Sequence, residues 1–131
     1  MRAIDTNVLI RIATRDDERQ TRAAEAVVAS GAWVSHVVLA ETAWVLVALY
    51  GLSRSQLAEV LSRLLSHISI AIQDADLVSE ALALFKRSKK ISFPDCLILQ
   101  IARKGGHSPL ATFDRDLAKL DGVERIAASL E

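Results

Sequence analysis

Short apolar runs alternate along this chain with longer segments in which apolar residues recur at helical spacing. The short runs predicted as strands lie at 2–4, 32–34, 69–72, 110–113 and 123–126, and those at 2–4 and 123–126 include charged residues. Alternation of this kind is typical of βαβ units, in which helices connect strands that pair in parallel. The sequence therefore predicts an α/β fold with five strands in a mostly parallel sheet.

Residues with known capping preferences mark where the predicted helices begin. We expect N-caps at Ser35, Ser53 and Asp74, with Gln56 completing a capping box after Ser53. Pro94 is expected at the first helical position of a later helix, because proline lacks an N–H and the residue before it is biased away from helix.

Composition limits the possible architectures and partners. The 131 residues suit one domain, 1–131, and 51% hydrophobic content indicates a well-developed core. Sixteen basic and sixteen acidic side chains cancel, which excludes a polycation that coats nucleic acid. The single cysteine, Cys96, excludes an internal disulfide and is typical of a reducing compartment.

No membrane or export segment is expected. Asp5 interrupts the N-terminal apolar stretch, which argues against a signal peptide, and the longest nearly apolar run, 42–52, is too short to span a bilayer. We therefore expect a cytoplasmic protein that makes no membrane contact.

Four acidic residues occupy positions near strand ends or helix starts. Asp5 and Asp114 each follow a predicted strand, Glu41 lies early in the helix after the second strand, and Asp95 opens a helix. Asp5, Asp95 and Asp114 have a simple alternative role, because acids cap helices or stabilise their N-termini. Glu41 fits that role less well, since its helix is apolar on most sides and a carboxylate there needs a partner.

Parallel connections place the carboxyl ends of strands at one edge of a sheet, where these four acids would meet. Two carboxylates about 4 Å apart repel by roughly 4 kcal/mol at a surface-like dielectric, so such a cluster needs a cation. Oxygen ligands favour Mg²⁺ or Mn²⁺, and no Cys/His spacing suits zinc. From spacing alone, a shared metal site and four separate structural acids remain equally open.

Four blocks of this sequence together resemble the PIN domain, and in particular the small VapC-type toxin ribonucleases. The blocks are Ile4-Asp5-Thr6-Asn7-Val8-Leu9, Glu41 in its helix, Phe93-Pro94-Asp95-Cys96-Leu97-Ile98 and Ala111-Thr112-Phe113-Asp114. They follow the family's order over essentially the whole chain. The resemblance implies a three-layer sandwich with helices on both faces of a central five-stranded sheet.

The resemblance also implies a set of functional residues. Asp5, Glu41, Asp95 and Asp114 match the catalytic, metal-binding acids of the family. Thr6, Asn7 and Thr112 match supporting positions, Asp116 is a further candidate, and Cys96 stands where alanine is commoner. The implied activity is Mg²⁺- or Mn²⁺-dependent hydrolysis of RNA phosphodiester bonds, in which the metal activates water and neutralises the leaving oxygen.

The implied partners are an RNA substrate, a cognate antitoxin protein and a second copy of the chain. Trp33, Trp44, Tyr50 and the 57–65 helix carry more apolar surface than one sheet face needs, which favours a homodimer and a groove for an antitoxin helix. Basic residues at helical spacing (Arg11, Arg15, Arg19, Arg22) and the 86–90 cluster either bind phosphates or are ordinary solvated charge.

Two other functions remain open at this point. A catalytically weak PIN scaffold that acts through protein binding is the main alternative, although the intact set of acids favours an enzyme. A phosphatase with an aspartate nucleophile is disfavoured, because its Asp-x-Asp motif has Asn7 in place of the second acid.

Overall fold

The computed structural model describes residues 1–127, which contain helices and strands in the predicted alternation. The elements are β1 (Arg2–Ala3), α1 (Thr6–Thr14), α2 (Glu18–Ala29), β2 (Ala32–Val34), α3 (His36–Ala48), α4 (Arg54–Leu65), β3 (Ile70–Ile72), α5 (Ala75–Arg87), α6 (Phe93–Lys104), β4 (Leu110–Thr112), the 3₁₀ helix η1 (Leu117–Lys119) and β5 (Val123–Arg125).

All five predicted strands are present and every strand pair is parallel, as the sequence predicts. They pair in two groups, however: a three-stranded sheet in the order β1-β2-β3 and a separate two-stranded sheet of β4 and β5. β1 contributes two residues and pairs with β2 alone within residues 1–127. The predicted continuous sheet is therefore divided between β1 and β4.

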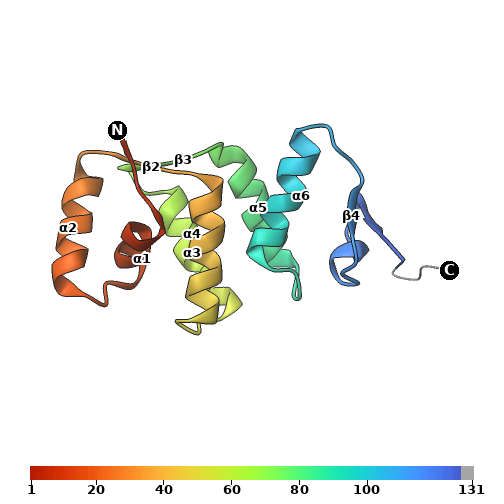
Figure 1. Cartoon of the computed structure of the whole chain (residues 1–131), viewed down its shortest axis with the longest axis horizontal. Coiled ribbons are helices and arrows are strands. Elements are labelled where there is room, and N and C mark those ends of the chain that lie inside the picture. Colours follow the sequence, from red (N-terminus) through yellow and green to blue (C-terminus); the bar gives the residue numbers. More distant parts are fainter. Residues whose placement is uncertain (128–131) are drawn as a thin grey trace.

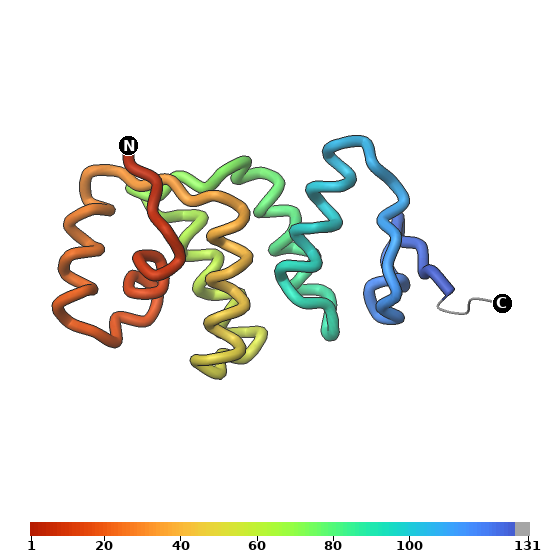
Figure 2. The backbone as a smooth tube through the Cα atoms, in the orientation of Figure 1, coloured from red at the N-terminus to blue at the C-terminus, as the bar shows by residue number. Residues whose placement is uncertain are grey.

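The helices lie side by side along an elongated molecule. Figure 1 shows α2 at one end, α5 and α6 beyond α3 and α4, and β4 at the far end beyond α6. The tube in Figure 2 follows the same path and shows that α5 and α6 stand between β1 and β4. Within residues 1–127 no helix is both long and apolar enough to cross a bilayer.

The core is built mainly from leucines of α3, α4 and α6 that are fully buried. Leu39, Leu46, Leu61 and Leu97 each expose 2% of their surface or less. Phe93 packs edge to face on Phe85 of α5, with ring centroids 6.0 Å apart. Burial of each such side chain contributes about 1.5–3 kcal/mol, so these contacts fix α6 against α3 and α5.

The predicted caps are confirmed for two of three helices. Ser35 accepts a hydrogen bond from the Val38 amide, and Ser53 and Gln56 form the complete capping box of α4. The predicted cap of α5 was wrong. Asp74 precedes the helix in a left-handed conformation, with φ of 45°, and its side chain makes no capping hydrogen bond. It pairs with Lys104 instead, and this ammonium group lowers the pKa of Asp74.

The helix α6 begins one residue earlier than predicted. Ser92 is its N-cap, accepting from the Asp95 amide at 3.2 Å, and Phe93 is its first residue, so Pro94 is second. The bias of a residue before proline is a backbone preference. It is outweighed here because the helical position buries the Phe93 ring in the core.

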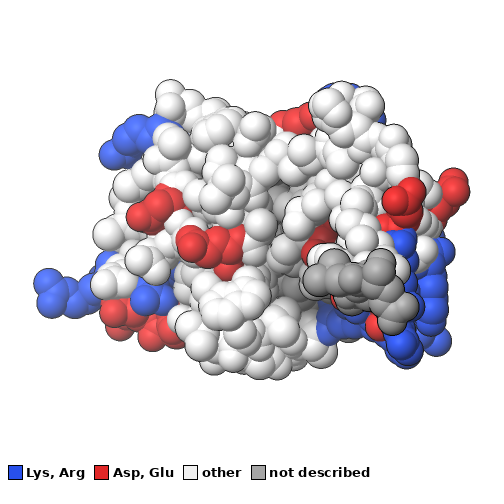
Figure 3. Space-filling model, turned by 45° about the vertical axis from the view of Figure 1, so that its right-hand side comes forward, with Lys and Arg blue, Asp and Glu red and all other residues white. Residues whose placement is uncertain are grey.

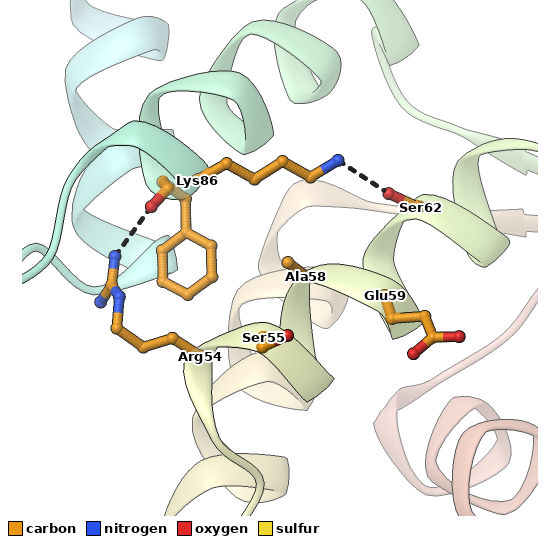
Figure 4. Close-up of a pocket in the computed structure, with 7 residues that line it drawn as sticks. Arg54, Ser55, Ala58, Glu59, Ser62 and Lys86 are labelled. Carbon is orange, nitrogen blue, oxygen red and sulfur yellow. Dashed lines mark hydrogen bonds between the residues drawn. The ribbon is translucent and has the colours of Figure 1, made fainter.

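Arg54 joins α4 to the end of α5. Its guanidinium donates to the carbonyls of Phe85, Ser88 and Ile91 at 2.7–2.9 Å and lies 3.9 Å from the centre of the Phe85 ring. Figure 4 shows this group on one side of a pocket of about 530 Å³, with Lys86 reaching Ser62 across it. Arg54 thus supplies donors to carbonyls that the end of α5 leaves free.

We predict that Arg54→Met lowers the free energy of unfolding by about 2–4 kcal/mol, because it leaves several part-buried carbonyls without donors. Arg63→Met is the matched control on the same helix. Arg63 makes an exposed ion pair with Glu59, and we expect its loss to cost about 0–1 kcal/mol. Urea unfolding of both variants measures the difference, and equal losses would contradict the role given to Arg54.

The Cys96 thiol is fully buried in α6, and burial raises its pKa to about 11. The native thiol therefore keeps its proton at pH values where the unfolded thiol, with an ordinary pKa of 9.0, has lost it. We predict that this group removes stability as pH rises from about 9 to about 11. Urea titrations at pH 8 and pH 10.5 should show a smaller loss for Cys96→Ala than for the wild type.

Candidate functional site

Asp5 lies directly after β1 and opens α1. Its carboxylate accepts a hydrogen bond from the Val8 amide at 3.1 Å, and the side chain is exposed. The simple capping role considered for this residue is therefore present in the structure. Capping uses one carboxylate oxygen, so the second oxygen of Asp5 remains available to a ligand.

Glu41 lies beside this turn because α1 packs against α3. The Thr6 hydroxyl, in the first turn of α1, donates to Glu41 Oε1. Glu41 is exposed, which differs from the buried position that its apolar helix suggested. Its expected partner is present, and Thr6 thereby positions a second carboxylate next to Asp5.

A shallow pocket of about 360 Å³ adjoins Asp5 between α1 and α2. Asp5, Asn7, Arg11 and Gln20 supply its polar side chains. The Arg11 guanidinium is held by Asp16 at 3.0 Å, Gln20 at 2.6 Å and the Tyr50 hydroxyl at 3.2 Å. A fixed cation beside a carboxylate and an amide gives this pocket both signs of charge.

Asp95 lies in the first turn of α6, half-buried, and its backbone amide is bound by the Ser92 cap. The N-terminal ends of helices favour negative charge, which suits a carboxylate at this position. Because α6 packs on α3, this acid belongs to the same layer of helices as Glu41.

Asp114 follows β4, and its carboxylate organises the turn into η1. It accepts from the amides of Asp116 at 2.8 Å and Leu117 at 3.0 Å, while its own amide donates to Thr112 Oγ1 at 3.0 Å. The Thr112 hydroxyl thus holds the backbone of Asp114 in this turn. Asp116 forms an exposed ion pair with Lys119 at 3.6 Å.

One chain brings part of the predicted acid set together. Asp5 and Glu41 meet through Thr6, but Asp114 lies on the far side of α6 with β4 (Figure 1). Among residues 1–127 no three metal-binding side chains come within reach of one ion. The donor chemistry suits Mg²⁺, but this arrangement of a single chain does not assemble a metal site.

The molecular surface is hollowed near the middle of the face that Figure 3 shows. Figure 3 shows acidic side chains on both sides of this hollow, whereas lysines and arginines gather toward the two ends.

The comparisons with known proteins match this chain to a family over most of its length. The family model of the PIN domain matches residues 3–123. The chain belongs to the PIN domain family. The resemblance seen in the four acidic blocks is thereby confirmed at the level of the family, and with it the α/β PIN fold.

One solved structure among the matches is that of the Mycobacterium tuberculosis toxin VapC20, described as a Sarcin-Ricin loop cleaving toxin. It is 21% identical, with 94% of this chain and 97% of that chain covered and a TM-score of 0.43. No curated protein matches the sequence significantly.

One feature of this PIN domain was not expected from the sequence: the bridge that Tyr50 makes between α1 and α3. Its hydroxyl donates to Asp16 at 2.8 Å and accepts from Arg11. Hydrogen bonds from Thr14 and Tyr50 lower the pKa of Asp16, so the carboxylate stays charged. The sequence left phosphate binding and ordinary solvated charge open for the arginines of this region. In the structure Arg11 has protein partners that no local pattern reveals.

We predict that Asp5→Ala lowers the free energy of unfolding by about 1 kcal/mol, because alanine cannot cap α1. Asp5→Asn should stay within about 0.5 kcal/mol of the wild type, since asparagine is an equally good N-cap. Thermal or urea unfolding measures both. A large loss in Asp5→Asn would show that the charge itself stabilises the fold and would make this variant unsuitable for tests of activity.

Proposed function

We propose that this PIN domain is a metal-dependent endoribonuclease, the toxin of a VapC-type toxin-antitoxin pair, which works in the cytoplasm. The observation that carries the proposal is the presence of all four acids in the family's order, with Asp5 and Glu41 already joined through Thr6. Asp95 and Asp114 complete the set of ligands for Mg²⁺ or Mn²⁺, and the whole chain 1–131 forms one domain.

The supporting residues act by positioning the acids. Thr6 fixes Glu41 with its hydroxyl, and Thr112 fixes the backbone of Asp114. Asn7 lies beside Asp5 in the pocket with Arg11, where its amide can donate to an RNA phosphate. These side chains orient charge, and none of them is a candidate nucleophile.

We predict that the protein cleaves RNA, that EDTA abolishes cleavage and that Mg²⁺ or Mn²⁺ restores it. Asp5→Asn should lose at least a hundredfold in rate while keeping its stability. Glu59→Gln is the control, because Glu59 is an exposed acid on α4 that pairs with Arg63, and it should retain full activity. Full cleavage in excess EDTA would refute the metal dependence.

The alternative function, a scaffold that acts through protein binding, predicts no cleavage at any metal concentration. The intact acid set favours the enzyme. Gel analysis of total RNA after incubation with the purified chain distinguishes the two, provided that Asp5→Asn is run beside it to exclude a contaminating nuclease.

An antitoxin is proposed to bind an apolar pocket that opens beside the N-terminus of α6. The pocket holds about 330 Å³ and lies between α3, α4 and α6, with Trp44, Val47, Leu57 and Phe93 in its wall. The Trp44 side chain is 61% exposed. An amphipathic helix buries such apolar side chains in a groove, and the pocket suits one or two of its residues.

We predict that Trp44→Ser weakens binding of the protein encoded by the adjacent upstream reading frame at least tenfold, because a large apolar contact is lost. Val37→Ser is the control, since Val37 is 78% exposed on the same helix but lies outside the pocket. Calorimetric titration measures both affinities. Wild-type affinity in Trp44→Ser would refute this location of the antitoxin.

A further inference from the structure

Within residues 1–127 the strands β1, β3, β4 and β5 each have one unpaired edge. The edges of β1 and β4 differ from the other two, because an acid of the predicted set follows each of these strands. The Ile4 amide donates to the Trp33 carbonyl, so in β1 the main-chain groups of Ala3 point away from β2. The Leu110 amide donates to Gly122, so in β4 the main-chain groups of Ala111 point away from β5. Both edges belong to parallel strands, and both carry small, exposed alanines.

The two strands with these edges also precede acids that lie apart in the structure. Asp5 follows β1 and Asp114 follows β4. When two strands pair in parallel, the residues after their carboxyl ends lie at the same edge of the sheet. Pairing of β1 with β4 therefore brings Asp114 to Asp5 and Glu41, which a single chain in this conformation does not do.

The same chain cannot make this pair without losing contacts that it already has. The unit of β4, η1 and β5 contacts its own α6, because Arg103 donates to the Asp121 carbonyl, and Leu117 of η1 is 5% exposed. Both α5 and α6 stand between β1 and β4 (Figure 2). Pairing with a second copy does not require these contacts to break, because each β4–β5 unit can stay against its own α6.

The size of the exposed surface supports a missing partner of this kind. The chain exposes 7976 Å², whereas a compact monomer of this mass exposes about 6,800 Å². The excess is comparable to the roughly 800 Å² that each partner buries in a standard stable interface. Part of it is apolar, since Phe113, next to Asp114, is 64% exposed.

We propose that two copies of this chain exchange their β4–β5 units, β4 of each copy pairing in parallel with β1 of the other. Each of the two resulting sites combines Asp5 and Glu41 of one chain with Asp114 of its partner. The exchange is reciprocal, so the assembly closes as a two-fold dimer. The catalytic part of this inference rests on the proposed ribonuclease function, and the strand pairing does not.

In the register that places Asp5 level with Asp114, Ala3 lies opposite Thr112, and opposite residues of paired strands have their side chains on the same face of the sheet. The strand pairing is therefore tested by cross-linking of the double variant Ala3→Cys/Thr112→Cys in the full chain. Paired strands lie about 4.8 Å apart, within the range that a disulfide bridges. Under mild oxidation we expect a covalent dimer on a non-reducing gel, which neither single variant forms at the same level. An internal disulfide in a monomer would show that β4 pairs within its own chain, and no cross-link beyond the single variants would show that the edges do not meet. Either result overturns the proposal.

The shared site is tested by complementation between Asp5→Asn and Asp114→Asn. Each variant alone should be inactive, whereas the heterodimer, co-expressed with two tags and purified through both, has one site with every acid intact. We expect about half of the wild-type rate from it. An inactive heterodimer beside an active wild type would place all acids of a site in one chain and overturn the proposal. An inactive wild type would instead refute the ribonuclease function and leave the cross-linking result to decide the pairing.

Discussion

A β-strand pairs its main-chain groups with other strands on both sides only when it has a neighbouring strand on each side. In this fold the missing pair between β1 and β4 determines how the predicted acids are separated. β1 pairs with β2 alone, and β4 pairs with β5 alone, within the described residues 1–127. The division of the sheet separates Asp5 and Glu41 from Asp114 and leaves the molecule elongated. Free strand edges are a liability unless something covers them, and a second copy is the cover that also completes the acid set.

Local patterns in the sequence were sufficient for the elements of this fold. The apolar runs predicted all five strands, and the serines before α3 and α4 are the caps that their positions indicated. The exceptions have long-range causes. Asp74 pairs with Lys104, which lies thirty residues away in the sequence at the end of α6. Burial of Phe93 extends α6 by one residue at its start. A capping pattern includes no information about such distant partners.

The candidate site could be predicted as a set of residues but not as an arrangement. Asp5, Glu41, Asp95 and Asp114 stand out in the sequence because they lie near strand ends and helix starts, and the resemblance to the PIN domain family is what implies a shared role for them. The distances between these acids depend on whether β1 and β4 pair. The sequence of either strand alone does not determine that pairing. Capping explains the local conformation of Asp5 and Asp114, and it is compatible with a second role because each carboxylate keeps acceptor capacity for a ligand.

The central claim is that the acids of one site come from two chains. A crystal structure grown with Mn²⁺ tests it most directly, because anomalous scattering locates the ion independently of the fitted protein. We predict an Mn²⁺ ion bound by Asp5 and Glu41 of one chain and by Asp114 of its partner, with β1 and β4 of different chains paired in parallel. An ion bound by Asp5, Glu41 and Asp114 of the same chain would contradict the claim.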